Sequence, residues 1–341
     1  AAGLRPDDPV VLFHESVEKV IHPLVQGIHE DRRKALGVSD LKPFDLQVDF
    51  RGNEPLRPFS NSRELIDKGI EVMRRVHPFF GKCIEKMDQM GHLDLDSRSG
   101  KAPGGYNYPL YESGYPFIFM NAAGTQTDLT TFVHEAGHAV HSVLTQELEL
   151  TDFKSCPSEV AELASMSMEL ISMSQWDVFY DDPADLKRAQ LDQLERAAGS
   201  LTWIATIDNF QHWLYENPEH THAERIAAWE DIYTRFHSEL NWNGMAVYRD
   251  HLWQKQLHLF EVPFYYIEYG MAQLGAIAVY RNFKEDPEKA LEQYIAALKL
   301  GNTRTIPEVY REAGIRFDFS ADYLVELSEF ISGEIRKLHA E

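Results

Sequence analysis

The chain has 341 residues and a formal net charge of −21 at neutral pH. So much negative charge disfavours nucleic acid and anionic membrane surfaces as partners. No apolar run approaches the length of a membrane span. The two cysteines, Cys83 and Cys156, lie far apart in the sequence, and their spacing matches neither a disulfide framework nor a metal-binding motif. We therefore expect a globular protein of the reducing cytoplasm.

The predicted elements are helical over most of the chain. Apolar residues recur at helical spacing over 9–36, and Gly37 marks the end of this first helix. Residues 44–50 alternate apolar and polar side chains, which predicts a strand or an extended segment. Residues 60–90 predict one long helix or two, and 92–121 change to strands and turns.

Two further helices follow, and both begin at recognisable capping residues. The first is expected to start near Thr127 or Asp128, and the second to cover 155–170, with Pro157 in its first turn and a serine as its cap. The remaining helices are expected over 185–215, 223–236, 247–260, 273–280, 287–299, 305–313 and 320–338. The sequence thus predicts a mainly α protein with one small β-sheet.

Residues 134–138 read His-Glu-Ala-Gly-His, an H-E-x-x-H motif in the middle of a predicted helix. Because residues four apart share a helix face, His134 and His138 can direct imidazole nitrogens at one point, as a zinc ion requires. Glu135 would then lie beside the metal, where its carboxylate can accept a proton from water. The alternative is a pair of buried histidines with a purely structural role.

A third ligand is expected from the helix over 155–170. Glu162 and Glu169 are seven residues apart and share a face that is otherwise small or apolar. Burying both carboxylates is expensive without a cation or hydrogen-bonding partners. Glu159 lies at the helix start, where the macrodipole favours a carboxylate for ordinary reasons. We therefore predict Glu162 as the ligand and Glu169 as the acceptor for a histidine N–H.

His141 is a rival ligand, because it lies three residues past His138 on the same face. Histidines at 134, 138 and 141, on consecutive turns, would not converge on one ion. We therefore expect His141 to be packed behind the ligands.

These motifs resemble the thimet oligopeptidase and oligoendopeptidase F family of zinc peptidases. The resemblance rests first on HEAGHAVHS and on AELAS, whose glutamate follows 28 residues after His134. The segment 101–106 with 115–121 resembles the family's Gly-rich loop and the strand that borders its cleft. The segment 258–270 resembles its His-and-Tyr segment, most closely in the Pz-peptidase-like branch. The resemblance runs from about Leu12 to near the C-terminus.

The resemblance implies a zincin-like, multi-helical catalytic domain with a small β-sheet beside the active-site cleft and one Zn²⁺ ion. Members of the family are longer and carry a further helical N-terminal portion. We therefore expect residues 1–341 to be a single catalytic region without that portion. A deep channel would admit short peptides and exclude folded proteins. No particular oligomeric state is predicted.

The resemblance also implies substrate contacts at Gly104, Gly105 and Tyr106. The two glycines leave no side chain between the backbone and an approaching ligand. The strand over 117–120 could use an exposed edge to pair with an extended peptide. From residue pattern alone, an ordinary turn and a core strand fit equally well.

Donors for a developing oxyanion are expected from the C-terminal segment. Tyr265 and Tyr269 are four residues apart and would share a helix face. The resemblance assigns this role to His258, Tyr265 and Tyr269, with Tyr266 as the alternative and as a substrate contact. Tyrosines at this spacing are also common in protein cores.

The predicted function is zinc-dependent hydrolysis of internal bonds in short peptides. A related zinc carboxypeptidase, which trims free C-termini, is the nearest alternative. A second alternative is a non-catalytic peptide-binding protein that keeps a structural zinc. The presence of Glu135 disfavours it, because a structural site has no use for a base beside the metal.

Overall fold

The computed structural model describes residues 8–340, which divide into two compact units. Unit 1 comprises residues 8–54, 194–271 and 318–340, and unit 2 comprises 55–193 and 272–317. Both are built largely of helices, which confirms the mainly α fold. None of the helices within 8–340 combines the length and the apolar character that crossing a membrane requires.

Unit 1 is helical apart from its loops. It contains α1 (Pro9–Ser16), the π-helical turn η1 (Val17–Ile21), α2 (His22–Leu36), the 3₁₀ helix η2 (Pro43–Gln47), α9 (His222–Phe236), α10 (Ala246–Arg249), the 3₁₀ helix η4 (Leu252–Lys255), α11 (His258–Glu261) and α15 (Ala321–Ala340). Two longer helices, α8 (Pro183–Glu216) and α12 (Tyr266–Glu285), contribute residues to both units.

The helix predicted over 9–36 is confirmed, with the π-helical turn in its middle. Pro23 lies two residues after the end of that turn, and it has no N–H to donate to an α-helical hydrogen bond. Gly37 ends α2 in the left-handed conformation, with φ of +69°.

The strand or extended segment predicted over 44–50 is wrong. Residues Pro43–Gln47 form a 3₁₀ helix instead. Pro43 fixes φ near the helical value, and the Asp45 carboxylate accepts the Lys42 N–H at 2.7 Å. This local hydrogen bond closes a turn and overrides the alternating pattern.

The continuous helix predicted over 247–260 is also wrong, because the segment is divided among α10, η4 and α11. Two indole N–H groups take carbonyls that a continuous helix would use. Trp229 donates to the Arg249 carbonyl at 2.7 Å, and Trp253 donates to the Asp250 carbonyl at 3.2 Å.

Unit 2 combines helices with the small sheet. It contains α3 (Ser62–Val76), α4 (Pro78–Gln89), β1 (Leu93–Asp96), β2 (Tyr106–Tyr108), β3 (Phe117–Ala122), α5 (Gln126–Leu144), α6 (Thr151–Lys154), α7 (Ser158–Ser172), the 3₁₀ helix η3 (Met173–Val178), α13 (Pro287–Lys299) and α14 (Ile306–Glu312). The break between α3 and α4 lies at His77, which is extended because Pro78 follows it.

The three strands lie in the order β1–β3–β2, with β1 parallel and β2 antiparallel to β3. The free strand edge expected at 117–120 is therefore wrong, because β3 is the central strand. A three-residue Tyr-Asn-Tyr strand is too short to be recognised by alternation, yet it covers that edge. Among the described strands, the outer edges belong to β1 and β2.

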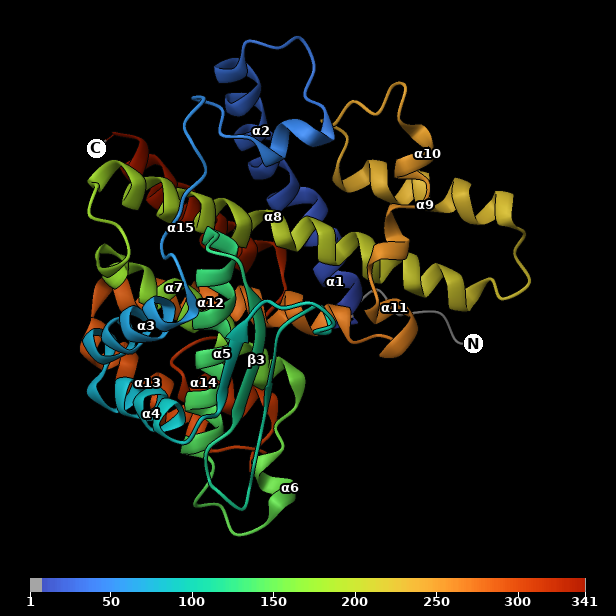
Figure 1. Cartoon of the computed structure of the whole chain (residues 1–341). Helices are drawn as coiled ribbons and strands as arrows, with labels where there is room; N and C mark the ends of the chain where they lie inside the picture. Colours follow the sequence, from blue (N-terminus) through green and yellow to red (C-terminus); the bar gives the residue numbers. More distant parts are fainter. Residues whose placement is uncertain (1–7, 341) are drawn as a thin grey trace. The chain divides into compact units, whose positions relative to one another are not determined.

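Helix α5 packs against α7 and also contacts β3 (Figure 1). Its N-cap is Thr125, earlier than the expected Thr127 or Asp128. Asp128 completes a capping box from the third helical position: its side chain accepts the Thr125 N–H at 2.8 Å. At α7, Pro157 occupies the N-cap position and no serine side chain caps the helix.

Gly137 allows the backbones of α5 and α7 to approach closely. A Cβ atom at this position would lie 2.7 Å from the Ser165 Cα and 2.8 Å from the Ala164 carbonyl oxygen. Both obstacles are backbone atoms, so they cannot move aside as a flexible side chain would. The crossing places residues of the H-E-x-x-H motif opposite the middle of α7.

We expect Gly137→Ala to separate α5 from α7. The added methyl group overlaps the α7 backbone, which should lower the free energy of unfolding by about 1–3 kcal/mol or more. Separation of the helices should also weaken metal binding. Denaturant unfolding measures the free energy of unfolding, and metal titration measures the affinity. Gly199→Ala in α8 is the control, because an added Cβ there meets nothing within 4 Å. Wild-type stability and metal affinity in Gly137→Ala would contradict this packing argument.

Candidate metal centre

His134, His138 and Glu162 come together in unit 2, the histidines from α5 and the glutamate from α7. The Glu162 Oε2 atom lies 3.4 Å from His134 Nε2 and 3.6 Å from His138 Nε2. One potential ligand atom from each residue lies within 4.8 Å of the others. Across residues 8–340, this is the single group of three or more His, Cys, Asp or Glu side chains arranged to hold a metal ion.

The donor set fits a tetrahedral metal ion. Bonds of about 2.0–2.1 Å to nitrogen and oxygen place neighbouring ligand atoms of a tetrahedron about 3.4 Å apart. The two distances from Glu162 are close to this separation. Two imidazoles and one carboxylate leave a fourth position for water or substrate, which is typical of catalytic sites.

The charges in the site also favour a cation. Glu162 is buried, and Ser165 Oγ donates to its Oε2 atom at 3.0 Å. Burial opposes protonation of His134, but hydrogen bonds to Glu162 and Glu169 raise its pKa well above the usual value. Burial lowers the pKa of His138 to about 4. The Glu162 and Glu169 carboxylates therefore stabilise a positive charge in a buried region.

Glu169 fixes the orientation of the His134 ring. Its Oε1 atom lies 2.6 Å from His134 Nδ1, which leaves Nε2 directed toward Glu162. Gln193 Nε2 donates to the other Glu169 oxygen at 2.7 Å, and Thr130 Oγ1 donates to Gln193 Oε1 at 3.1 Å. Sequence reasoning missed both residues. No spacing pattern links Gln193 of α8 to the H-E-x-x-H motif, whereas Thr130 lies on α5 four residues before His134, a helical spacing that could have indicated it.

Glu135 is 5% exposed, and burial raises its pKa to about 7. Its Oε2 atom is buried and has no hydrogen-bond partner within the described part of the chain. Gly105 lies close to this carboxylate: a Cβ there would be 3.6 Å from Glu135 Oε1 and 3.1 Å from Thr131 Cγ2. The Gly-rich loop therefore comes directly to the carboxylate.

His141, the rival ligand, is engaged elsewhere. Its Nε2 atom lies 3.2 Å from Cys156 Sγ, and burial lowers its pKa to about 3. It therefore does not join the group formed by His134, His138 and Glu162.

The loop before β2 and the first residue of β2, Tyr106, are exposed. Gly104 has a φ of +95°, a conformation that favours glycine. Tyr106 is 49% exposed, and its ring stacks on Phe119 of β3 with 4.9 Å between centroids.

His258 and the tyrosines form a second cluster, which belongs to unit 1. Tyr269 Oη lies 3.3 Å from His258 Nε2, and Gln256 Nε2 donates to His258 Nδ1 at 2.8 Å. Tyr266 Oη donates to Gln256 Oε1 at 3.1 Å. Tyr265 precedes the first residue of α12, so the shared helix face expected for it with Tyr269 is wrong. Their rings nevertheless lie in contact, with 5.1 Å between centroids.

Comparison with known proteins identifies the family. The family model described as peptidase family M3 matches residues 6–329. The chain belongs to peptidase family M3. This confirms the resemblance drawn from the motifs at residues 101–106, 134–138 and 258–270.

Relatives of this M3 chain include oligoendopeptidases. It is 24% identical over 346 residues to the chromosomal oligoendopeptidase F of Lactococcus lactis subsp. cremoris, covering 94% of this chain and 54% of that protein. It is 21% identical over 296 residues to oligopeptidase PepF of Bacillus subtilis, covering 86% of this chain and 43% of that protein. The chain thus spans about half the length of these curated relatives.

A solved structure shows the same fold. The structure of Pz peptidase A with inhibitor 2 superposes with a TM-score of 0.91 at 30% sequence identity. The match covers 98% of this chain and 59% of that one. The two-unit, mainly helical architecture with its small sheet is therefore that of an M3 peptidase.

We expect Glu169→Gln to weaken metal binding by about 10- to 100-fold, because an amide is a poorer acceptor for the His134 N–H than a carboxylate. Titration with Zn²⁺ against a chromophoric chelator measures the affinity. Glu159→Gln, on the same helix but outside the metal-binding group, should leave it unchanged. Equal affinities in the two variants would show that Glu169 does not support the site.

Proposed function

We propose that this chain is the catalytic portion of a zinc-dependent oligoendopeptidase that hydrolyses internal bonds of short peptides. The observation that carries the proposal is the buried Glu135 carboxylate beside the group formed by His134, His138 and Glu162. A purely structural metal site would have no use for that carboxylate. The names of the oligoendopeptidase relatives support the same reaction class.

His134, His138 and Glu162 would hold the zinc ion. When bound, zinc would lower the pKa of a water molecule and polarise the carbonyl of the bond to be cleaved. The hydrogen bond from His134 to Glu169 would keep the ring in the orientation that metal binding requires.

Glu135 would act as the general base and then as the general acid. Its raised pKa, about 7, suits a group that accepts and releases a proton near neutral pH. Its Oε2 atom would accept a proton from the attacking water, since no side chain of the described chain occupies it. The same carboxyl group would then give the proton to the leaving amine.

The peptide would lie along β2. In the three-stranded sheet β2 has one side on β3, so its other edge can add an extended chain through main-chain hydrogen bonds. Gly105, at the start of this strand, lies close to Glu135, which would bring a paired peptide to the base. Gly104, Gly105 and Tyr106 would thus contact substrate.

His258, Tyr265 and Tyr269 of unit 1 would supply the donors that stabilise the developing oxyanion. Tyr269 and His258 already share a hydrogen bond in unit 1, and Tyr265 contacts both rings. Burial raises the pKa of Tyr266 to about 12, which keeps its hydroxyl a neutral donor. Tyr266 would serve as the alternative donor or as a substrate contact.

We expect Glu135→Gln to retain the metal but to lower peptide hydrolysis by about 10²–10⁴-fold, the contribution of general acid–base catalysis. The measurement pairs metal content with turnover of a short, internally quenched peptide. Glu147→Gln, at an exposed position beyond α5, should behave like wild type. Near-normal turnover by Glu135→Gln would reject this mechanism.

A peptide blocked at both ends distinguishes an endopeptidase from the two alternatives, a carboxypeptidase and a non-catalytic peptide-binding protein. We expect the protein to cleave quenched peptides of roughly five to twenty residues, and to lose this activity with a chelator. A folded protein should be spared, since unfolding it requires about 5–15 kcal/mol. Product masses show where each peptide is cut. Cleavage restricted to free C-termini would indicate a carboxypeptidase, and binding without cleavage would indicate a non-catalytic peptide-binding protein.

A further inference from the structure

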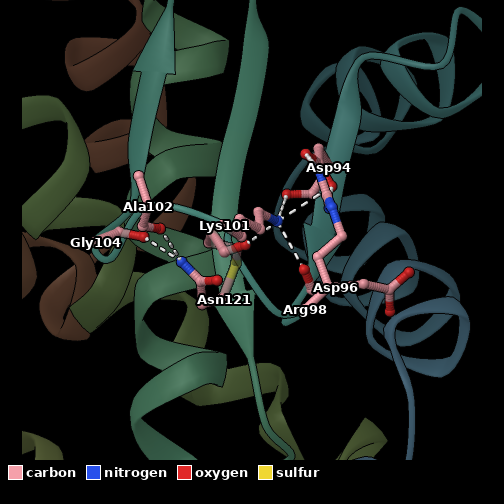
Figure 2. Close-up of polar contacts among 8 residues, drawn as sticks. Asp94, Asp96, Arg98, Lys101, Ala102, Gly104 and Asn121 are labelled. Atoms are coloured by element: carbon pink, nitrogen blue, oxygen red, sulfur yellow. Dashed lines mark hydrogen bonds and ion pairs between the residues drawn. The ribbon is translucent and has the colours of Figure 1, made fainter.

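Lys101 is buried within unit 2, although it lies in an exposed loop. Its side chain is 1% exposed, and its Nζ atom lies 2.9 Å from the Asp94 carbonyl oxygen and 2.8 Å from the Asp96 carbonyl oxygen. It also donates to the Met120 carbonyl and lies 3.1 Å from Asp94 Oδ1. Figure 2 shows the ammonium group between β1, which carries Asp94 and Asp96, and β3, with these contacts converging on it.

The position of these carbonyls explains why a lysine is needed. The register between β1 and β3 shifts between Asp94 and Asp96, and such an irregularity disrupts the local ladder of backbone hydrogen bonds. An ammonium group has three N–H donors and can serve carbonyls on both strands at once. Lys101 therefore joins β1 to β3 at the place where their ladder is irregular.

A buried ammonium group is stable only if its charge is compensated. Asp94 supplies the opposite charge, and its carboxylate also forms a paired contact with Arg98 at 2.6 and 2.8 Å. Hydrogen bonds from Arg98 and then Lys101 lower the pKa of Asp94 to about 2. The Asp94 carboxylate therefore stays ionised at neutral pH.

Asn121 of β3 anchors the residues that follow Lys101. Its Nδ2 atom donates to the Ala102 carbonyl at 2.8 Å and to the Gly104 carbonyl at 3.2 Å. Figure 2 shows this amide directed at the loop. Gly105 comes next, and it is the residue that lies against Thr131 and Glu135. The loop is thus fixed to the sheet immediately before it reaches the proposed base.

We propose that Lys101 and Asn121 are positioning residues that hold the 102–105 loop and β2 at the depth where a peptide substrate meets Glu135. Neither residue belongs to the metal-binding group, and the bonds described for their side chains end on the sheet and the loop. Their effect would be exerted through the backbone of Gly104 and Gly105. The inference rests on the proposed function, because it assumes that the peptide lies along β2.

The test compares Lys101→Met and Asn121→Ala with wild type in steady-state cleavage of a quenched peptide. Loosening β2 removes binding that the ground state and the transition state share, so KM should rise about 10-fold while kcat changes less than about threefold. Partial unfolding would instead lower kcat and leave KM unchanged. Lys82→Met is the control, because Lys82 is exposed on α4 of the same unit.

Amide hydrogen exchange of residues 102–108 provides a second measurement that does not depend on activity. Exchange there should rise at least 10-fold in Lys101→Met and Asn121→Ala, with no rise in α5 or α7. An unchanged KM, or unchanged exchange in this segment, would overturn the positioning role. If wild type cleaves no peptide, the proposed function fails by itself, and the exchange result alone decides whether these two side chains anchor the loop.

Discussion

The close crossing of α5 and α7 at Gly137 is the constraint on which the metal centre depends. At this point a hydrogen atom takes the place of a side chain, so one helix backbone lies against the other. The approach brings Glu162 within 3.4 Å of His134 and 3.6 Å of His138. A tetrahedral metal ion needs its ligand atoms at such separations, and a wider crossing would place them too far apart.

Burial gives this arrangement its chemical character. Glu162 is almost fully buried. Glu169 orients the His134 ring, and Glu169 is itself held by Gln193, which accepts a hydrogen bond from Thr130. Burying two carboxylates in such a setting is costly, which favours a bound cation. The same burial raises the pKa of Glu135 toward neutrality. One apolar environment therefore favours both the metal and the base.

The remaining residues of the proposed machinery belong to the sheet of unit 2 and to the cluster of unit 1. Lys101 and Asn121 fix the loop that leads Gly105 to Glu135, so the position of β2 depends on a cluster of charges outside the metal centre. His258 and Tyr269 form their own hydrogen-bonded group in unit 1.

Local pattern was enough to predict the helical class, the H-E-x-x-H motif, and Glu162 and Glu169 as partners, because helical periodicity places those side chains on shared faces. Other features depend on long-range contacts, which periodicity does not specify. Long-range pairing with β2 covered the edge expected to be free at β3, and indole N–H groups divided the segment after Val247. Likewise, Gln193 reaches Glu169 from a distant helix. The β2–β3 pairing and the bonds from Trp229 and Gln193 join residues from separate elements, so no local pattern records them.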